Sequence, residues 1–462
     1  MTKSNCRFTE FSVHRGPLGC EVNVTSAGTA KTLFLKHAQL RYRPLAALVR
    51  TALRHRVMIV ADGEDWQRTH AAIIPYLRAA SVAREYAPVI KSVADAIFDR
   101  LAERSAGVGP VPAPVDIEVE SSMRVVISSV MGYVLFGQAL PLGEAEYLEK
   151  TLSEVTRVVR GSIPTLINTV VAAVLRVLNC SQHQVFMLPR EQRRAIRDLI
   201  GWIGAKVDAA RLGAMPTPLL DSLQSRFAHH GRIRQKRCVV AENAMMLIAG
   251  IETTAAALTF AIAEIAANPS VREAVITEAR RDGEAARDGE ALTVQYPYIY
   301  HVLRETLRRH TIVPTMLREA ETDLEVLGER AGGGCAVTVN IKRGSVLRYL
   351  PVQGNMRRSI WEQPHGFDPN RFARPLTAEQ KKNYHPFGLG PQSCPGRAMA
   401  VTEIMLILKS FFERLDIEHK AITQPIAVER NALLTIRPVG VTARVLAAAR
   451  RADPRAAVMH GR

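Results

Sequence analysis

One cysteine in a loop rich in glycine and proline constrains this chain more than any other feature. The stretch from His385 to Arg397 reads HPFGLGPQSCPGR, and residues 397–415 then repeat apolar side chains at helical spacing. Pro395 suits the first turn of that helix, where a missing N–H costs nothing. The amides at the start of the helix would point toward the sulfur of Cys394, and such a position favours a thiolate.

Glycines at positions 388, 390 and 396 remove side chains around this cysteine, so a large flat group could lie against the backbone. An anionic sulfur beside such a space is what a thiolate ligand of haem iron requires. The plainer alternative is a buried free cysteine beside a helix cap.

The spacing Phe-x-x-Gly-x-x-x-Cys-x-Gly, from Phe387 to Gly396, resembles the haem-binding loop of the cytochrome P450 family. The resemblance implies that Cys394 is the axial ligand of haem b, and that Phe387, Gly388 and Gly396 bind the cofactor. The family usually carries Arg or His where this chain has Gln392. That difference weakens one expected contact to a haem propionate and leaves the ligand unchanged.

The longest helical pattern covers residues 236–268 and ends before Pro269. It is apolar almost all round between residues 244 and 267, which predicts burial over roughly 50 Å of helix. Within it lies the sequence Ala-Gly-Ile-Glu-Thr-Thr, residues 249–254. A buried Glu252 costs several kcal/mol unless it is paired, and Gly250 in mid-helix costs about 1 kcal/mol, so both break local rules. Such breaks concentrate at functional sites.

Two interpretations fit this hexapeptide on its own. In the first, Glu252 and Thr253 form an acid–alcohol proton relay beside a groove for dioxygen. In the second, Glu252 pairs with a distant arginine and the threonine hydroxyl bonds back to the carbonyl one turn earlier. The resemblance to the central helix of the family favours the first, with Ala249 and Gly250 lying against the haem.

Three other positions acquire a cofactor role only from the resemblance. Trp66 and His70 lie four apart on one helix face and match a Trp-x-x-x-Arg pattern that contacts a propionate, with His70 in place of Arg. Arg318 matches a strand arginine that binds a propionate. The same resemblance groups Glu305, Arg308 and Arg371 into a structural triad that holds the segment leading to the cysteine loop.

The chain of 462 residues has no linker, low-complexity run or internal repeat, so we expect a single domain over residues 1–449 and a basic, disordered tail over 450–462. The resemblance implies a mainly helical fold with small β-sheets, in which haem lies between the long central helix and the cysteine loop. Short strands are predicted at 313–317, 323–327, 337–341 and 346–349, and a last hairpin over 433–445.

The six cysteines are scattered and no secretory signal is present, which predicts a cytoplasmic protein. The first fifteen residues are polar, and the apolar run 163–178 is interrupted and too short to span a bilayer, so no transmembrane anchor is expected. The resemblance adds that the region 144–211 forms a mobile lid over the substrate entrance.

The net charge of +17, from 61 Lys and Arg against 44 Asp and Glu, favours an acidic partner. The basic residues are dispersed and no nucleic-acid-binding motif is present, so nucleic acid is not expected. We predict a monomer that docks an acidic ferredoxin, supplied by its reductase, near the cysteine loop. The predicted docking residues are basic: Arg68, Arg78, Lys381, Lys382, Arg397 and Lys409.

The resemblance implies a monooxygenase of the soluble bacterial type, which inserts one oxygen atom of O2 into a hydrophobic small molecule such as a terpenoid, steroid or fatty acid, with electrons from NAD(P)H. Isomerisation, dehydration, coupling, peroxide-driven oxidation and a non-catalytic haem sensor remain as alternatives. The positions that the resemblance assigns to the substrate pocket are Met245, Ile248, Ala249, Val313, Thr315 and Met316.

Overall fold

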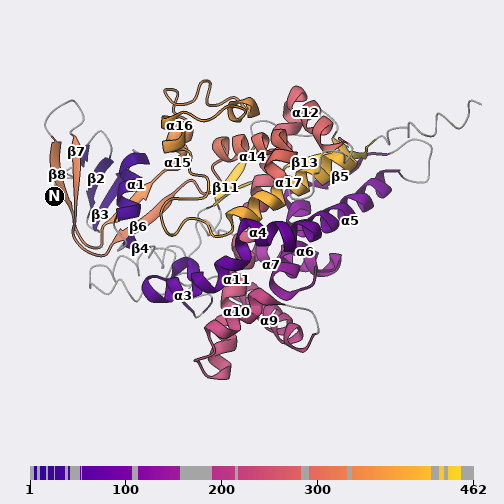
Figure 1. Cartoon of the computed structure of the whole chain (residues 1–462), viewed down its shortest axis with the longest axis horizontal. Helices are drawn as coiled ribbons and strands as arrows, with labels where there is room; N and C mark the ends of the chain where they lie inside the picture. Colours follow the sequence, from indigo (N-terminus) through magenta and orange to yellow (C-terminus); the bar gives the residue numbers. More distant parts are fainter. Residues whose placement is uncertain are drawn as a thin grey trace, which may run out of the picture.

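A 36-residue helix, α11 (Arg232–Ala267), runs through the middle of the molecule, and other long helices pack around it (Figure 1). It begins one turn before the predicted start. It ends where predicted, because Asn268 turns to an extended conformation and Pro269 opens the next helix. Most of its residues are buried, as the apolar pattern indicates.

The computed structural model describes most of the chain. The described residues are 5–7, 11–16, 19–24, 27–36, 40–41, 53, 55–106, 113–156, 190–213, 217–281, 291–329, 336–417, 426–430 and 435–448. The predicted tail 450–462, the apolar run 163–178 and the centre of the predicted lid lie outside them.

Helix α6 (Val119–Phe136) packs along α11, and α17 (Arg397–Arg414) packs between α11 and α5 (Ala87–Ala106). These helices share one large hydrophobic core. Within the described ranges, the other helices of eight or more residues are α1 (Ala27–Lys36), α3 (Gly63–Ile73), α7 (Leu142–Thr156), α9 (Arg190–Leu212), α10 (Pro218–Arg226), α12 (Pro269–Ala279) and α14 (Pro297–Arg309).

The largest β-sheet lies at one end of the molecule beside α1 (Figure 1). Its six strands run in the order β1-β2-β3-β9-β6-β4. They are β1 (Asn5–Arg7), β2 (Phe11–Gly16), β3 (Gly19–Val24), β9 (Val346–Tyr349), β6 (Met316–Ala320) and β4 (Leu40–Arg41). Strand β3 pairs in parallel with β9, so the N-terminal segment joins a strand more than 300 residues away.

The predicted strand at 323–327 is found as β7 (Leu324–Glu329), which pairs with β8 (Ala336–Ile341). The first predicted strand, 313–317, begins three residues late, at Met316 of β6. Gly344 lies in the turn between β8 and β9 and adopts a positive φ of 81° there.

The predicted hairpin over 433–445 is wrong. Strand β12 (Ile436–Pro438) pairs with β11 (Val428–Arg430), and β13 (Thr442–Ala447) pairs with β10 (Leu415–Ile417) and β5 (Val115–Glu118). Alternation of side chains identified strands here, but their partners lie elsewhere in the chain, which local pattern does not encode.

Two helices are long and apolar enough to cross a membrane by composition, Val119–Phe136 and Arg232–Ala267. Of their most apolar windows, 83% and 78% are buried against the rest of the protein. A buried core helix passes the same test, so these two helices carry little evidence of a membrane span.

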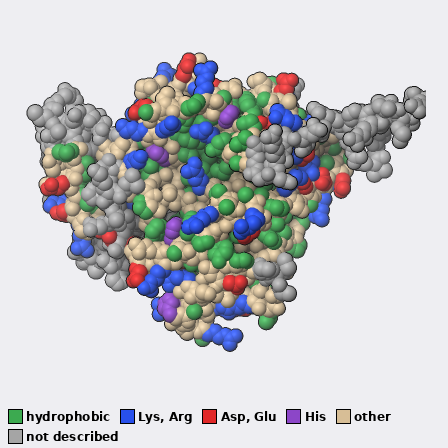
Figure 2. Space-filling model, in the orientation of Figure 1, with side chains coloured by type: hydrophobic (Ala, Val, Ile, Leu, Met, Phe, Trp, Pro, Cys, Tyr) green, Lys and Arg blue, Asp and Glu red, His purple; other side chains and the backbone are tan. Residues whose placement is uncertain are grey.

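Lysine and arginine side chains are spread over the face shown in Figure 2 rather than gathered in one patch. The dispersed pattern agrees with the sequence, in which no long basic run occurs. The net positive charge therefore does not define one docking surface, and the position of an acidic partner depends on small local groups of basic side chains.

Candidate active site

A narrow accessible strip follows one side of α11 through an otherwise buried stretch. Between Cys238 and Ala266 every residue is buried except Met246, Ala249, Gly250 and Thr253. Their spacing of three, one and three residues places them on one helix face. Three of the four are residues that the sequence assigned to the site, and Met246 is a fourth that it missed.

Local geometry explains why the strip contains a glycine and a threonine. A Cβ atom at Gly250 would lie 3.2 Å from Met131 Sδ on α6, so glycine allows these two helices to approach closely. The Thr253 hydroxyl donates a 2.8 Å hydrogen bond to the Ala249 carbonyl oxygen, one turn back. This bond competes with the helix ladder, and it holds the hydroxyl close to the accessible strip.

Glu252 is buried next to Thr253, and its carboxylate forms an ion pair on another side of α11. Arg124 Nη2 donates to Glu252 Oε2 at 2.6 Å, and Thr156 Oγ1 lies 3.4 Å from Oε1. Arg124 is itself buried on α6 and also contacts Glu120 at 3.2 Å and Ser153 at 3.1 Å. Both features of the structural interpretation, a paired Glu252 and a back-bonded Thr253, are therefore present.

The buried cluster holds two carboxylates for one guanidinium. Burial raises the pKa of Glu120 to about 7, against the opposing effect of Arg124. Sequence reasoning missed Arg124, although a Glu-x-x-x-Arg pair inside the apolar segment 119–136 is a signal that could have found it. The cluster ties α6 to the helix turn that carries the candidate catalytic residues.

The cysteine loop is folded by its own backbone. Cys394 N–H donates to the Phe387 carbonyl oxygen at 2.8 Å, and Ser393 N–H donates to the Gly390 carbonyl oxygen at 3.0 Å. Gly388 and Gly390 have φ angles of 89° and 78°, a conformation that favours glycine at these two positions. The sequence predicted these glycines as space for a ligand, and the structure shows that the loop itself also requires them.

The Cys394 side chain is exposed to solvent, yet protein atoms surround it closely enough that burial raises the pKa of its thiol. The backbone N–H of Gly396 opposes this shift by hydrogen bonding to the sulfur. A Cβ atom at Gly396 would lie 3.9 Å from Cys394 Sγ. An accessible sulfur with an amide donor and open backbone beside it fits a thiolate ligand of haem.

Strand β6 approaches the cysteine loop, because a Cβ atom on Gly388 would lie 4.0 Å from Met316 Cε. The same strand carries Arg318, which donates to the Leu317 carbonyl oxygen at 2.8 Å and lies over the Phe34 ring at 5.1 Å. Arg397, just after the loop, lies over the Phe387 ring at 5.7 Å. Met316 of β6 therefore lies beside the cysteine loop, and the contact of Arg318 with a haem propionate stays a prediction.

Trp66 and His70 stack on α3, with ring centroids 4.7 Å apart and an angle of 23° between the rings. Both are partly exposed, and burial lowers the pKa of His70. They form one aromatic surface, as their spacing of four residues indicates. Their contact with a haem propionate stays a prediction.

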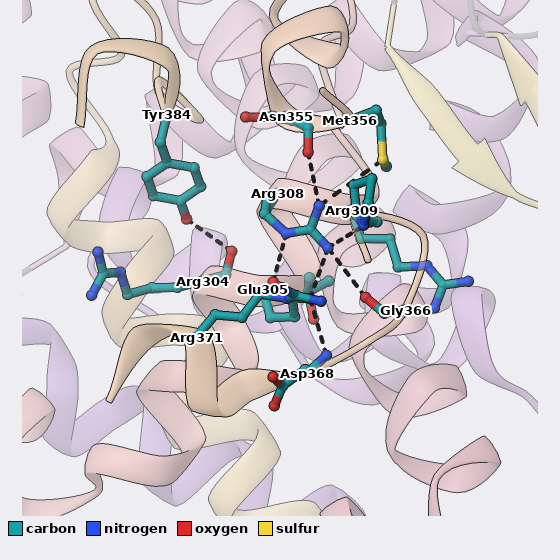
Figure 3. Close-up of polar contacts among 12 residues, drawn as sticks. Arg304, Glu305, Arg308, Arg309, Asn355, Met356, Gly366, Asp368, Arg371 and Tyr384 are labelled. Atoms are coloured by element: carbon teal, nitrogen blue, oxygen red, sulfur yellow. Dashed lines mark hydrogen bonds and ion pairs between the residues drawn. The ribbon is translucent and has the colours of Figure 1, made fainter. Parts of the chain in front are cut away.

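The Glu305–Arg308–Arg371 triad is assembled as the sequence indicates (Figure 3). Arg308 donates to Glu305 at 2.7 and 2.8 Å, and Arg371 Nε lies 3.3 Å from Glu305 Oε1. Arg308 is fully buried and also donates to the backbone carbonyl oxygens of Asn355 and Pro364, each at 2.8 Å. The triad therefore fastens α14 to the segment that leads into the cysteine loop.

A second buried acid links α17 to α11, and sequence reasoning missed it. Burial raises the pKa of Glu403 to about 8, while the Thr254 hydroxyl lowers it. Glu403 is 1% exposed, so its carboxyl group packs in the core between the two helices. It lies nine residues after Cys394 inside an apolar helical pattern, which is the signal that could have identified it.

Comparison with known proteins gives the family. Residues 11–443 match the family described as Cytochrome P450. The chain is 23% identical to "Cytochrome P450 3A12" of Canis lupus familiaris, over 90% of this chain and 80% of that protein. It is 24% identical to the mitochondrial "25-hydroxyvitamin D-1 alpha hydroxylase" of Rattus norvegicus, over 78% and 70%. It is 32% identical to "Thromboxane-A synthase" of Sus scrofa, over 43% and 36%.

The family match covers the accessible strip on α11, the buried triad and the cysteine loop in one continuous alignment. Members of this family bind haem through a cysteine thiolate, and this agrees with the accessible sulfur of Cys394. The chain belongs to the cytochrome P450 family and is an enzyme of the monooxygenase type.

Proposed function

We propose that this enzyme inserts one oxygen atom of O2 into a hydrophobic small molecule of terpenoid, steroid or fatty-acid type. The observation that carries the proposal is the accessible strip of Met246, Ala249, Gly250 and Thr253 on a buried helix. Three of these four residues are small or apolar, and only Thr253 offers a hydroxyl. A surface of this composition favours apolar ligands.

The predicted pocket positions on α11 and their neighbours differ in exposure. Met245 and Ile248 are buried, whereas Met246 and Ala249 lie on the accessible strip. Met316 approaches the cysteine loop at Gly388. We therefore propose that Met246, Ala249 and Met316 contact the substrate.

When bound, haem supplies the activation of dioxygen, and the residues of this chain bind it and control protons. We propose that Cys394 holds the iron and that Thr253 presents a proton on the accessible strip. Glu252 forms a buried ion pair with Arg124 at 2.6 Å, so its carboxylate must leave that pair to reach the Thr253 hydroxyl. We propose that Glu252, once it has left the pair and taken up a proton from solvent, passes that proton to Thr253.

Stoichiometry tests the proposed reaction. With redox partners supplied, monooxygenation consumes one O2 and one NAD(P)H for each oxygenated product. Isomerisation or dehydration would form product without consuming O2 in that ratio, and peroxide-driven oxidation would proceed without NAD(P)H. A screen for ligands that shift the spin state of the haem spectrum identifies the compounds to assay.

Thr253→Val is expected to uncouple the enzyme, because the isosteric side chain lacks the only hydroxyl on the strip. NAD(P)H oxidation continues, product per NAD(P)H falls by at least about tenfold and hydrogen peroxide rises, since general acid catalysis contributes about 10²–10⁴-fold. Thr259→Val is the matched control: Thr259 makes the same 2.8 Å bond to a carbonyl four residues back on α11 but is fully buried. Equal coupling in the two variants would contradict the assigned role.

We propose that electrons arrive from an acidic ferredoxin and its reductase. Lys381 and Lys382 are exposed at the end of α16 (Ala378–Asn383), and Arg397 is exposed beside the cysteine loop. Arg78 is also exposed, and Arg68 pairs with Glu64. Lys409 does not belong to this face, because it is only 8% exposed and bonds to Glu413.

Reversing the charge of Lys381 and Lys382 to glutamate should slow the first electron transfer from ferredoxin and leave substrate binding unchanged. The association rate should fall steeply with salt in the unaltered protein and weakly in the variant, because screening shortens to about 8 Å near physiological ionic strength. Stopped-flow reduction at several salt concentrations measures this. Rates that respond neither to salt nor to the reversal would place the docking face elsewhere.

The cytoplasmic location and the monomeric state are also proposals, and they rest on the scattered cysteines and on the burial of both long apolar helices. We also propose that the enzyme is of the soluble bacterial type. This proposal rests on the sequence resemblance, because the relatives named above come from mammals.

A further inference from the structure

A pocket lies at the N-terminal end of α11. It is open to solvent, has a volume of about 530 Å³ and is lined by His55, Gly231, Arg232, Ile233, Arg234, Arg237 and Cys238. Arg232 precedes Gly250 by 18 residues, which is about 27 Å along the helix. The pocket is therefore separate from the candidate active site.

Arg232, Arg234 and Arg237 bring three exposed guanidinium groups to this pocket. None of the three has an acidic partner within the part of the chain that the structure describes. Lys236, on the same turn, forms an ion pair with Asp208 at 2.5 Å. The pocket arginines thus remain available to an anion from solution.

A histidine, His55, also lines the pocket wall. Burial disfavours the charged form of His55, but the Cys238 and Glu242 side chains outweigh it and raise the pKa of His55 to about 9. Glu242 Oε1 lies 3.7 Å from His55 Nε2, and both Glu242 oxygens accept from Met58 N–H at 3.1 Å. Glu242 therefore faces His55 and Met58, and the three arginines that line the pocket keep its surface positive.

The backbone adds donors to these side chains. Gly231 caps α11 without a capping side chain, and the first helical bond runs from Gln235 N–H to the Gly231 carbonyl oxygen. The amides of the first turn are thus left without helical partners, and they favour an anion at this end. Guanidinium groups match the geometry of phosphate oxygens by bidentate hydrogen bonding.

We propose that this pocket binds a phosphate-bearing ligand through Arg232, Arg234, Arg237 and His55. The volume exceeds what a phosphate group alone fills, so an organic portion is accommodated. Ile233, which is 81% exposed, lines the same pocket and offers an apolar contact for that portion. At the end of the molecule formed by α9 and α10, histidine and basic side chains are visible in Figure 2.

The test uses the haem-loaded enzyme and inorganic pyrophosphate as the probe, titrated by calorimetry at constant ionic strength. Binding is expected in the unaltered enzyme, and it should weaken when the titration is repeated at a higher ionic strength. In Arg232→Gln/Arg234→Gln the affinity should fall at least about tenfold, because each lost charge-assisted hydrogen bond is strong. The control, Arg193→Gln/Arg197→Gln, removes two exposed arginines of α9 that lie outside the pocket and should bind as the unaltered enzyme does.

A second arm separates a free phosphorylated compound from a lipid headgroup. Sedimentation with vesicles of phosphatidic acid in phosphatidylcholine, against phosphatidylcholine alone, reports headgroup binding. Pyrophosphate binding that depends on the pocket arginines, without vesicle binding, assigns a free ligand, and arginine-dependent binding of both assigns a headgroup as well. Absence of pyrophosphate binding, or equal affinities in the two double variants, would overturn the proposal. Normal haem spectra in both variants show that each is folded.

Discussion

Replacing Cys394 by alanine is expected to abolish oxygen insertion and to remove the thiolate-type carbon monoxide band of the reduced protein. Cys394 presents an accessible sulfur, with the Gly396 amide directed at it, in a loop that its own backbone bonds hold in place. Alanine leaves the loop folded and removes the anionic donor that pushes electron density onto iron. Absorption difference spectra and product formation measure the two effects.

Cys238→Ala is the matched control, because Cys238 is a buried free cysteine on α11, away from the loop. It should keep the thiolate band and retain activity. A normal band in Cys394→Ala would show that another residue binds the iron.

Arg308→Ala should destabilise the protein by about 3–5 kcal/mol, since breaking a buried ion pair leaves an uncompensated charge. Glu305 would lose its bidentate partner, and the carbonyl oxygens of Asn355 and Pro364 would lose their donors (Figure 3). Because the triad fastens the segment before the cysteine loop, haem retention should fall as well. Denaturant unfolding followed by far-UV circular dichroism measures the loss of stability.

The control is Arg358→Ala, which removes an exposed arginine. Its free energy of unfolding should stay within about 0.5 kcal/mol of the unaltered protein. Arg308→Lys should be intermediate, because lysine keeps the charge but cannot form the bidentate pair. If Arg308→Ala unfolded at the same denaturant concentration as Arg358→Ala, the triad would not hold this region together.

Sequence alone predicted the features that are local in the chain. The apolar period of α11 and the proline after it set its length to within one turn, and the glycines and Cys394 identified the loop. The family match then confirmed the fold class and the cofactor. These features are encoded in short stretches, where propensity and period act directly.

Features that depend on distant partners could not be predicted in the same way. Glu252 was expected at the proton relay, yet its carboxylate pairs with Arg124, which lies 128 residues earlier in the chain. Gly250 was expected to lie against the haem, whereas its missing side chain also makes room for Met131 of α6. Lys409 reads as a surface charge in sequence and is buried beside Glu413. Such contacts are decided by which helices pack together, which one sequence does not state.

The bonds of Arg308 have a consequence for how the chain can vary in length. They join α14 to backbone carbonyl groups 47 and 56 residues further on, at Asn355 and Pro364. The segment between Arg308 and Asn355, which contains strands β6 to β9, is thereby held at both ends. Loop-closure entropy rises only slowly with length, by about 0.6 kcal/mol for each doubling. Residues can therefore be added or removed between β7 and β8 at small cost while the segment that positions Cys394 stays anchored. A change of length there does not displace the iron-binding loop that follows Pro364.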